Sequence, residues 1–313
     1  MKIACIGNIT YDYSVYKEGF IEEGVRNSFN NVQTSPGGPA SNAAYVLSKF
    51  GSKVSLYGKI GNDESGKYIY NQMKKENIDL THVSISNEFM TPYSFIINNL
   101  TNNTRTICTV RAKNDYGKSK IEDITYETGY NYILTDGKYY EESLKLIKEN
   151  PQAVSIIDAG RATKEILLLC RSIDYIICSE DFANEVTKNT IGDNEQENKE
   201  IYKKLKSYFP NALELVITIG KNGYICMKDD ETLIMPSYNS GKQAIDTTGA
   251  GDIFHGAFTH AISSNYTFHE SLEFANITAS LSTTKNGGRY SCPDLTDVES
   301  RLKTTHKKLI KRK

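Results

Sequence analysis

The chain contains the stretch Asp246-Thr247-Thr248-Gly249-Ala250-Gly251-Asp252, and apolar residues recur at helical spacing directly after it. Two glycines flank one alanine, so the backbone can turn tightly and approach a ligand closely. A glycine turn at the start of a helix presents unpaired N–H groups and the positive end of the helix dipole. The stretch therefore predicts an anion-binding site.

Asp252 stands at the mouth of this predicted site, where a carboxylate would repel a bound anion. Its position makes chemical sense if it takes a proton from an attacking hydroxyl while the N–H groups of Gly249, Ala250 and Gly251 hold a phosphoryl group in transfer. A helix cap is the plain alternative for a lone Gly-x-Gly-Asp. The full run of residues 246–252 favours a catalytic Asp252, and His255 is interpreted as a packed helix histidine rather than a general acid.

Residues 246–252 resemble the C-terminal signature of the ribokinase-like carbohydrate kinases, also called the phosphofructokinase B family. The segment Pro36-Gly37-Gly38-Pro39-Ala40-Ser41-Asn42-Ala43-Ala44 resembles the N-terminal signature of that family, and the resemblance covers nearly the whole chain. It implies an α/β fold with three α/β/α layers, a mainly parallel central sheet and a small β-sheet lid. It also implies ATP and Mg²⁺. Because the chain has neither a P-loop nor a His-Arg-Asp loop, phosphoryl transfer would use the turn at 249–251.

Short apolar runs alternate with helical patterns along the chain, which predicts a parallel sheet covered by helices on both faces. The predicted strands cover residues 2–7, 54–58, 132–135, 154–158, 175–178 and 215–220. Residues 12–33 and 91–116 interrupt the alternation, and the resemblance implies that both form a lid over the sugar. We expect one domain over 1–313, with the nucleotide-binding part in 175–313.

The resemblance implies which residues contact the sugar: Asp12, Gly37, Gly38 and Asn42 match the family's positions. Asp12 directly follows the first predicted strand, and ligands bind past the carboxyl ends of strands in open α/β sheets. The plain alternatives are a turn residue for Asp12 and a polar helix-start residue for Asn42. Arg105, in the predicted lid hairpin, is a further candidate for substrate binding.

A second group of positions is implied for ATP. It consists of Ser179, Thr218, Gly220, Gly223, Asn276 and Gly288. The family often has Asn-x-x-Glu after the 175–178 strand, but this chain has Ser179-Glu180-Asp181-Phe182. Glu180 is the remaining acid there that could hold Mg²⁺ through water. Some family members bind K⁺ through the first aspartate of the signature, which is Asp246 here.

The composition indicates which binding partners and which cellular compartment are expected. The formal net charge is −1 and charges of both signs are scattered, so no nucleic-acid or membrane partner is expected. The six cysteines form no Cys-x-x-Cys pair, which predicts reduced thiols and a cytoplasmic protein. The first strand is too short and too soon broken to be a signal peptide. Edge strands of the lid predict a homodimer through the lid.

The leading functional hypothesis is an ATP-dependent kinase that phosphorylates a primary hydroxyl of a small neutral sugar, with a ketose preferred. Pro39 stands where ribose-specific members have Lys, so the predicted pocket lacks a cation there. The run 102–107 resembles the lid strand of ketohexokinase-like members. A sugar acid such as 2-keto-3-deoxygluconate is the first alternative, with Arg105 or Arg111 as its partner. A nucleoside kinase and a non-catalytic sugar or nucleotide sensor are the others.

Overall fold

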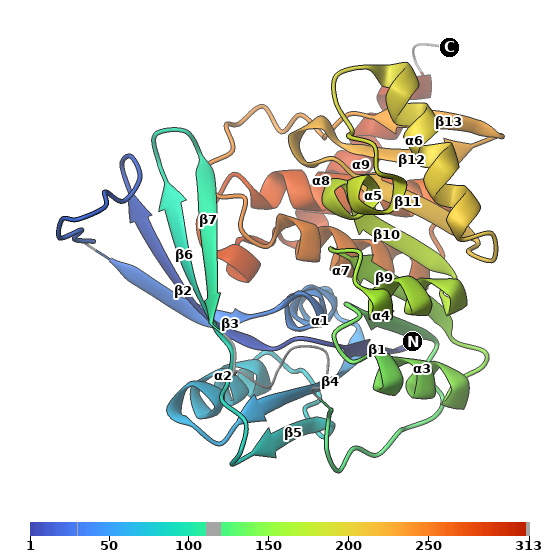
Figure 1. The fold of residues 1–313 in the computed structure, drawn as a ribbon. Helices are drawn as coiled ribbons and strands as arrows, with labels where there is room; N and C mark the ends of the chain where they lie inside the picture. The colour runs from blue at the N-terminus through green and yellow to red at the C-terminus, as the bar shows by residue number, and fades with distance from the viewer. Residues whose placement is uncertain (30, 111–119, 311–313) are drawn as a thin grey trace.

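The protein is described by a computed structural model, which covers residues 1–29, 31–110 and 120–310. Figure 1 shows a large central sheet between two layers of helices and a smaller sheet projecting beside it. The architecture is therefore three α/β/α layers with a small β-sheet, as predicted. Arg111 and the end of the predicted lid segment 91–116 fall outside the described residues.

The large sheet has the strand order β13-β12-β11-β10-β9-β8-β1-β4-β5. Its parallel strands are β1 (Lys2–Ile6), β4 (Lys53–Gly61), β5 (Val83–Ser86), β8 (Tyr132–Thr135), β9 (Val154–Ala159), β10 (Tyr175–Ser179) and β11 (Glu214–Thr218). The hairpin of β12 (Tyr224–Lys228) and β13 (Glu231–Met235) adds an antiparallel edge. Most residues of β1 and β10 are buried, because helices cover both faces of a parallel sheet.

Helices pack on both faces of the large sheet. One layer holds α1 (Pro39–Lys49), α2 (Glu64–Lys75), α7 (Ala250–Ser263), α8 (Phe268–Ser282) and α9 (Leu295–Ile310). The other holds α3 (Tyr140–Glu149), α4 (Lys164–Leu169), α5 (Glu180–Thr187) and α6 (Glu195–Tyr208). Short 3₁₀ turns cover Cys170–Ser172, Gly220–Asn222 and Gly288–Ser291.

Strand β1 shows how alternation assigns residues to the two layers. Ile3 and Cys5 pack into the core beneath α1 and α7, whereas Ala4 and Ile6 pack into the core beneath α3. Successive side chains of a strand point to opposite faces, so one apolar strand serves two cores. None of the helices in the described part of the chain is long and apolar enough to cross a membrane.

The small sheet has the order β3-β2-β6-β7, and both interrupting segments supply its strands. These are β2 (Thr10–Lys17), β3 (Val32–Gly37), β6 (Tyr93–Asn99) and β7 (Thr104–Val110). Strands β2 and β6 are parallel, and the other two pairs are antiparallel. Every residue of the edge strand β7 is exposed.

Candidate active site

The predicted anion-binding turn forms the start of α7. Gly249 has φ 73°, a left-handed conformation that glycine adopts without a steric penalty, and α7 begins at Ala250. Asp246 closes the loop before it, because its Oδ1 accepts a hydrogen bond from Thr248 N at 2.8 Å. Asp252 lies in the first turn of the helix. The candidate base and the N–H groups of the helix start are thus neighbours, and the N–H of Ala250 donates to Thr247 O at a long 3.3 Å.

Asp252 is held by Asn42, which lies on α1. Asn42 Nδ2 donates to Asp252 Oδ2 at 2.6 Å. Asp252 is partly accessible to solvent, yet desolvation by the surrounding protein raises the pKa of its carboxyl, against the lowering effects of Asn42 and His255. A raised pKa brings a carboxylate closer to the range in which it works as a general base at neutral pH.

Arg289 orients Asn42, which the sequence did not reveal. Its Nε donates to Asn42 Oδ1 at 3.0 Å, and its other nitrogens donate to Ser41 Oγ at 2.6 Å and Glu76 Oε2 at 3.1 Å. Arg289 is only 1% exposed. Because guanidinium has no acceptor, the amide oxygen of Asn42 must face it and the amide nitrogen must face Asp252.

Asp12, Gly37 and Gly38 meet where β2 and β3 lead into α1. Burial raises the pKa of the Asp12 carboxyl to about 6, with the charge of Asp252 adding to the shift. A Cβ at Gly37 would overlap with the Asp12 carboxylate, and a Cβ at Gly38 would overlap with the carbonyl of Asn8. Gly38 also has φ 91° and precedes the first residue of α1. The structure thus brings these predicted residues together beside Asn42 and Asp252.

Two further carboxylates lie at the carboxyl ends of β8 and β9. Asp136 Oδ2 accepts from Asn8 N at 2.7 Å, and burial raises the pKa of Asp136. Burial also raises the pKa of Asp158 to about 6, and its Oδ2 lies 3.4 Å from His255 Nδ1. The rule that singled out Asp12, a polar residue where a parallel strand ends, would have found both.

His255 is a packed histidine. It is 3% exposed, its Nδ1 lies 2.7 Å from the carbonyl oxygen of Gly251, and its Nε2 lies 3.2 Å from that of Ile177. Both ring nitrogens therefore face backbone oxygens within the fold.

Arg105 lies over the anion-binding loop. Its Nη1 donates to Thr247 Oγ1, although the two residues belong to β7 and to the loop before α7. Its positive charge also acts on Asp252, where it lowers the pKa of the carboxyl. Arg105 is therefore beside the predicted phosphoryl site in this structure.

The predicted nucleotide positions form two smaller groups. Ser179 and Thr218 are paired in register at the ends of β10 and β11. Ser179 Oγ caps α5 by accepting from Phe182 N at 3.1 Å, and Thr218 Oγ1 donates to Cys178 O at 3.2 Å. Both hydroxyls thus have structural partners.

The second nucleotide group adjoins residues 235–238. The side chain of Asn276 bonds to Pro236 O at 2.9 Å and to Tyr238 N at 3.2 Å. Gly223 has φ 102°, and a Cβ there would overlap with the carbonyl of Met235. The remaining predicted glycines, Gly220 and Gly288, also have positive φ, at 56° and 53°.

The two candidate metal positions differ in how many protein partners they already have. Glu180 is the first residue of α5, and the carboxylate has no hydrogen bond or ion pair within the described chain. Its oxygens are thus available to water bound to Mg²⁺. Asp246 is 3% exposed, and its two oxygens already accept hydrogen bonds from Tyr16, Thr248 and Gly287. Glu180 therefore fits a metal more readily than Asp246.

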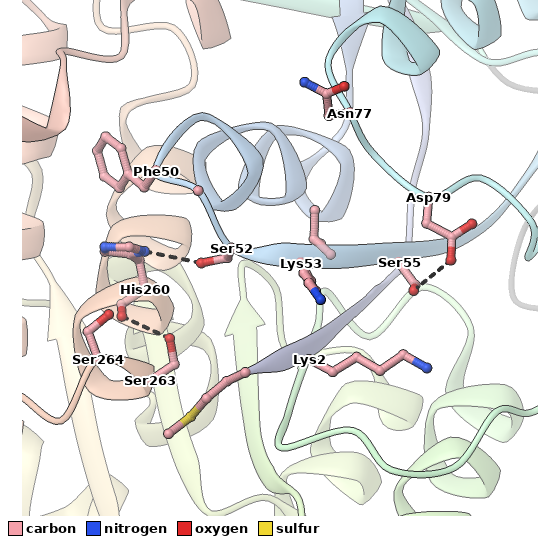
Figure 2. Close-up of a pocket in the computed structure, with 13 residues that line it drawn as sticks. Lys2, Phe50, Ser52, Lys53, Ser55, Asn77, Asp79, His260, Ser263 and Ser264 are labelled. Atoms are coloured by element: carbon pink, nitrogen blue, oxygen red, sulfur yellow. Dashed lines mark hydrogen bonds between the residues drawn. The ribbon is translucent and has the colours of Figure 1, made fainter.

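Two other polar groupings lie away from this site. A cavity of about 880 Å³ is lined by the amino ends of β1 and β4 and by the carboxyl end of α7, as Figure 2 shows with Lys2, Lys53 and His260. It thus lies at the amino ends of the strands of the large sheet, whereas Asp252 lies at their carboxyl ends. In the cluster Asp79, His82 and Glu127, both carboxylates already bind protein donors, among them Ser55, Thr81 and Lys2.

Comparison with known proteins gives one consistent family. A family model described as pfkB family carbohydrate kinase matches residues 1–295. A ribokinase of Haemophilus influenzae is 26% identical over 93% of this chain and 95% of its own length. A protein of Arabidopsis thaliana named "Probable fructokinase-7" is 24% identical over 97% of this chain and 93% of its own length. The crystal structure of a ribokinase from Thermotoga maritima has a TM-score of 0.77, at 23% identity, and covers 96% of this chain and 99% of that one.

Proposed function

This chain belongs to the pfkB family of carbohydrate kinases and is an ATP-dependent kinase, and from this premise we propose that it phosphorylates a primary hydroxyl of a small neutral sugar, preferably a ketose. The observation that carries the proposal is the pair Asn42–Asp252, joined at 2.6 Å at the start of α7. The sensor alternative is disfavoured, because a protein that only binds a sugar has no need of a base beside an anion-binding turn.

The chemistry follows from these positions. Asp252 takes the proton of the sugar hydroxyl as the oxygen attacks the terminal phosphorus of ATP, and the bond from that phosphorus to the bridging oxygen breaks, so that ADP leaves. The N–H groups of Gly249, Ala250 and Gly251 hold the charge that develops on the phosphoryl oxygens. Arg289 and Asn42 keep the Asp252 carboxylate turned toward the site. Mg²⁺, when bound with the nucleotide, neutralises charge on the phosphates, and Glu180 is the residue that would hold it through water.

Charge supports a neutral substrate. The sugar-side positions carry three carboxylates whose pKa values are raised by burial, namely Asp12, Asp136 and Asp252. Of the nearest described arginines, Arg289 is paired with the carboxylate of Glu76, whereas Arg105 donates to the neutral hydroxyl of Thr247 and keeps its charge. A phosphate or carboxylate on the substrate would meet these carboxylates, with Arg105 offsetting only part of the repulsion, whereas carboxylates readily accept hydrogen bonds from sugar hydroxyls.

Ribose is the second candidate, because the Haemophilus influenzae relative is named a ribokinase while the plant relative is named a fructokinase. Both sugars are uncharged. A sugar acid bound by Arg105 or Arg111 and a nucleoside are the remaining alternatives.

The deciding experiment is a panel of fructose, ribose, 2-keto-3-deoxygluconate, fructose 6-phosphate and nucleosides, compared by kcat/KM with ATP. We expect a neutral sugar to be the best substrate. A preference of about tenfold or more for an acid or a phosphosugar, ~1.4 kcal/mol, would overturn the neutral-sugar proposal.

The proposal extends to nucleotide and ions. ATP would bind in the part 175–313, near Ser179, Thr218, Gly220, Gly223, Asn276 and Gly288. Glu180→Gln should raise the Mg²⁺ concentration needed for half-maximal rate, whereas Glu185→Gln on the same helix should not. We also propose that K⁺ binds at Asp246. Equal reaction rates in K⁺ and in a large organic cation would exclude this K⁺ site.

We place the protein in the cytoplasm and propose a homodimer through the small sheet. The outer face of that sheet exposes Phe95, Val110 and Val32, at 45%, 37% and 51%. Exposed apolar groups beside an unpaired edge strand favour association with a second copy. Sedimentation should give a dimer, and Phe95→Glu should give a monomer. A monomeric wild-type protein would exclude the dimer.

A further inference from the structure

We propose that Tyr16 is a positioning residue that couples the small sheet to the geometry of the loop before the anion-binding turn. The inference rests on the proposed role of that turn in phosphoryl transfer. It concerns residues 246–249 and one row of side chains on the small sheet.

The row runs across three strands. Tyr16 of β2 is paired in register with Asn98 of β6, and Asn98 is paired with Arg105 of β7. Paired residues of neighbouring strands point to the same face of a sheet. The small sheet therefore presents a hydroxyl, an amide and a guanidinium side by side.

Each member of the row contacts one of three consecutive loop residues. The contacts are Tyr16 Oη to Asp246 Oδ2 at 3.1 Å, Arg105 Nη1 to Thr247 Oγ1, and Thr248 Oγ1 to Asn98 Oδ1 at 3.3 Å. An isolated contact between two surfaces would join a single pair of side chains. Here a row of the sheet matches a run of the loop residue by residue, so the sheet acts on the whole segment.

Asp246 is the residue through which the contact acts on the loop. Its Oδ1 accepts from Thr248 N at 2.8 Å, which fixes the turn directly before Gly249. Its Oδ2 accepts from Tyr16 Oη and from Gly287 N, both at 3.1 Å. The orientation of one buried carboxylate thus depends on β2, on the loop itself and on the segment at 287.

The Tyr16 hydroxyl is suited to this task. Burial, reinforced by the charge of Asp246, raises its pKa, so the hydroxyl stays protonated and donates. Its oxygen also lies 3.2 Å from Gln33 Oε1, but a carboxylate is the stronger acceptor for its single hydrogen.

The same strand carries the predicted sugar contact. Asp12 lies four residues before Tyr16 on β2, so the two side chains share a face. A strand rises about 3.3 Å per residue, which separates them by roughly 13 Å. Tyr16 already contacts Asp246 in this structure, so a sugar bound to Asp12 would hold the strand in the position that keeps this contact. Sugar binding is thereby linked to the shape of the phosphoryl-transfer loop.

The first test needs no substrate. Amide hydrogen exchange of residues 247–250 is compared among the wild type, Tyr16→Phe and Tyr13→Phe. Tyr13 lies on the same strand but on the opposite face, stacked on Phe95 at a centroid distance of 5.2 Å. We expect at least fivefold faster exchange in Tyr16→Phe and no change in Tyr13→Phe. Unchanged exchange in Tyr16→Phe would overturn the proposal.

A second comparison separates positioning from general loosening. Asp246→Asn removes the charged acceptor, so adding Tyr16→Phe to it should speed exchange of the loop little further. If the two substitutions have independent, multiplying effects on exchange, Tyr16 does not act through Asp246 and the proposal is wrong.

Kinetics give the functional readout. With the best sugar of the panel, Tyr16→Phe should lower kcat about tenfold, the loss of one hydrogen bond to a carboxylate, and leave the sugar KM within about twofold. A change confined to the sugar KM would instead identify a substrate contact and overturn the proposal. A wild type that phosphorylates no sugar of the panel would refute the proposed function, while the exchange comparison would still judge the coupling.

Discussion

Asp252 shows how much one residue depends on two others for its chemistry. Asn42 donates to its Oδ2, and Arg289 decides which end of the Asn42 amide does so. The hydrogen bond lowers the pKa of Asp252, but desolvation raises it more. The carboxylate is therefore both held in place and kept more basic than a free aspartate, which are the two properties that a general base requires.

Substitution of Asp252 by Asn tests that role. The amide has nearly the same shape but cannot take a proton, so turnover should fall by roughly 10²–10⁴ while the ATP affinity stays close to that of the wild type. Steady-state kinetics and nucleotide titration measure the two effects. A variant that turns over within a factor of a few of wild type would remove Asp252 from catalysis.

Asp12 gives a prediction about pH. Its folded-state pKa, about 6, lies above that of an ordinary aspartate. The folded state therefore holds the proton more tightly than the unfolded chain, and ionisation of Asp12 costs stability as pH rises toward and through 6. Asp12→Asn should accordingly raise the melting temperature at pH 8 and not at pH 4, where the wild-type carboxyl is already neutral.

The same substitution should weaken activity if Asp12 has its proposed role, in which the ionised carboxylate accepts hydrogen bonds from sugar hydroxyls. Wild-type kcat/KM should fall as pH drops below about 6, and Asp12→Asn should have a lower kcat/KM throughout. Thermal unfolding at several pH values and a pH–rate profile provide the measurements. An equal change in melting temperature at pH 4 and pH 8 would contradict the assignment.

At the scale of elements, the entry into α1 positions Gly38 and Asn42, two of the proposed sugar contacts. Gly38 precedes the helix at φ 91°, with Pro39 as its first residue and Asn42 in its first turn. Because a Cβ at Gly38 would overlap with the carbonyl of Asn8, the corner between β3 and α1 can pass close to β1 only with glycine there. The position of Asn42 is a consequence of that close approach.

The two glycines that flank α1 allow a matched test. Gly51 follows the helix at φ 85° but has open space where a Cβ would stand, so Gly51→Ala should cost only about 1 kcal/mol of unfolding free energy. Gly38→Ala adds a backbone overlap to the unfavourable φ and should cost more, and it should also raise the sugar KM. Urea unfolding and kinetics of both variants provide the measurements. Equal losses of unfolding free energy would show that the backbone moves aside at Gly38 with little energetic cost.

At the scale of the molecule, two sheets supply opposite sides of the site. The carboxyl edge of the large sheet contributes Asp136 and Asp158, together with Asp252 at the start of α7. The small sheet contributes Asp12 and Arg105, which lie on the face that contacts the loop 246–248. A substrate held between two such bodies makes contacts that depend on their relative position.

This arrangement predicts a response of the small sheet to sugar. If 12–33 and 91–116 act as a lid, a saturating neutral sugar should slow amide exchange in β2, β3, β6 and β7, because lids become ordered on closure. Strand β5, at the edge of the large sheet, serves as the internal control. Unchanged exchange in the small sheet at saturating sugar would count against a lid.

Local patterns were enough to predict the fold class and to propose most residues of the candidate site. Strand and helix periods are local properties, and the run 246–252 carries its own backbone requirements. The exact ends of helices depend on capping contacts, as at α2, which starts at Glu64 because Asp63 caps it by accepting from Gly66 N at 2.7 Å.

The partners of the candidate site residues became visible only in the folded chain. Arg289 orients Asn42 across 247 positions of the chain, and Tyr16 reaches Asp246 across 230. No periodic pattern in the sequence indicates either contact, since each depends on how two sheets and several helices pack. Local patterns report which face of an element is buried. Which polar groups meet is fixed by the packing of distant elements, because buried donors and acceptors must find partners wherever the fold places them.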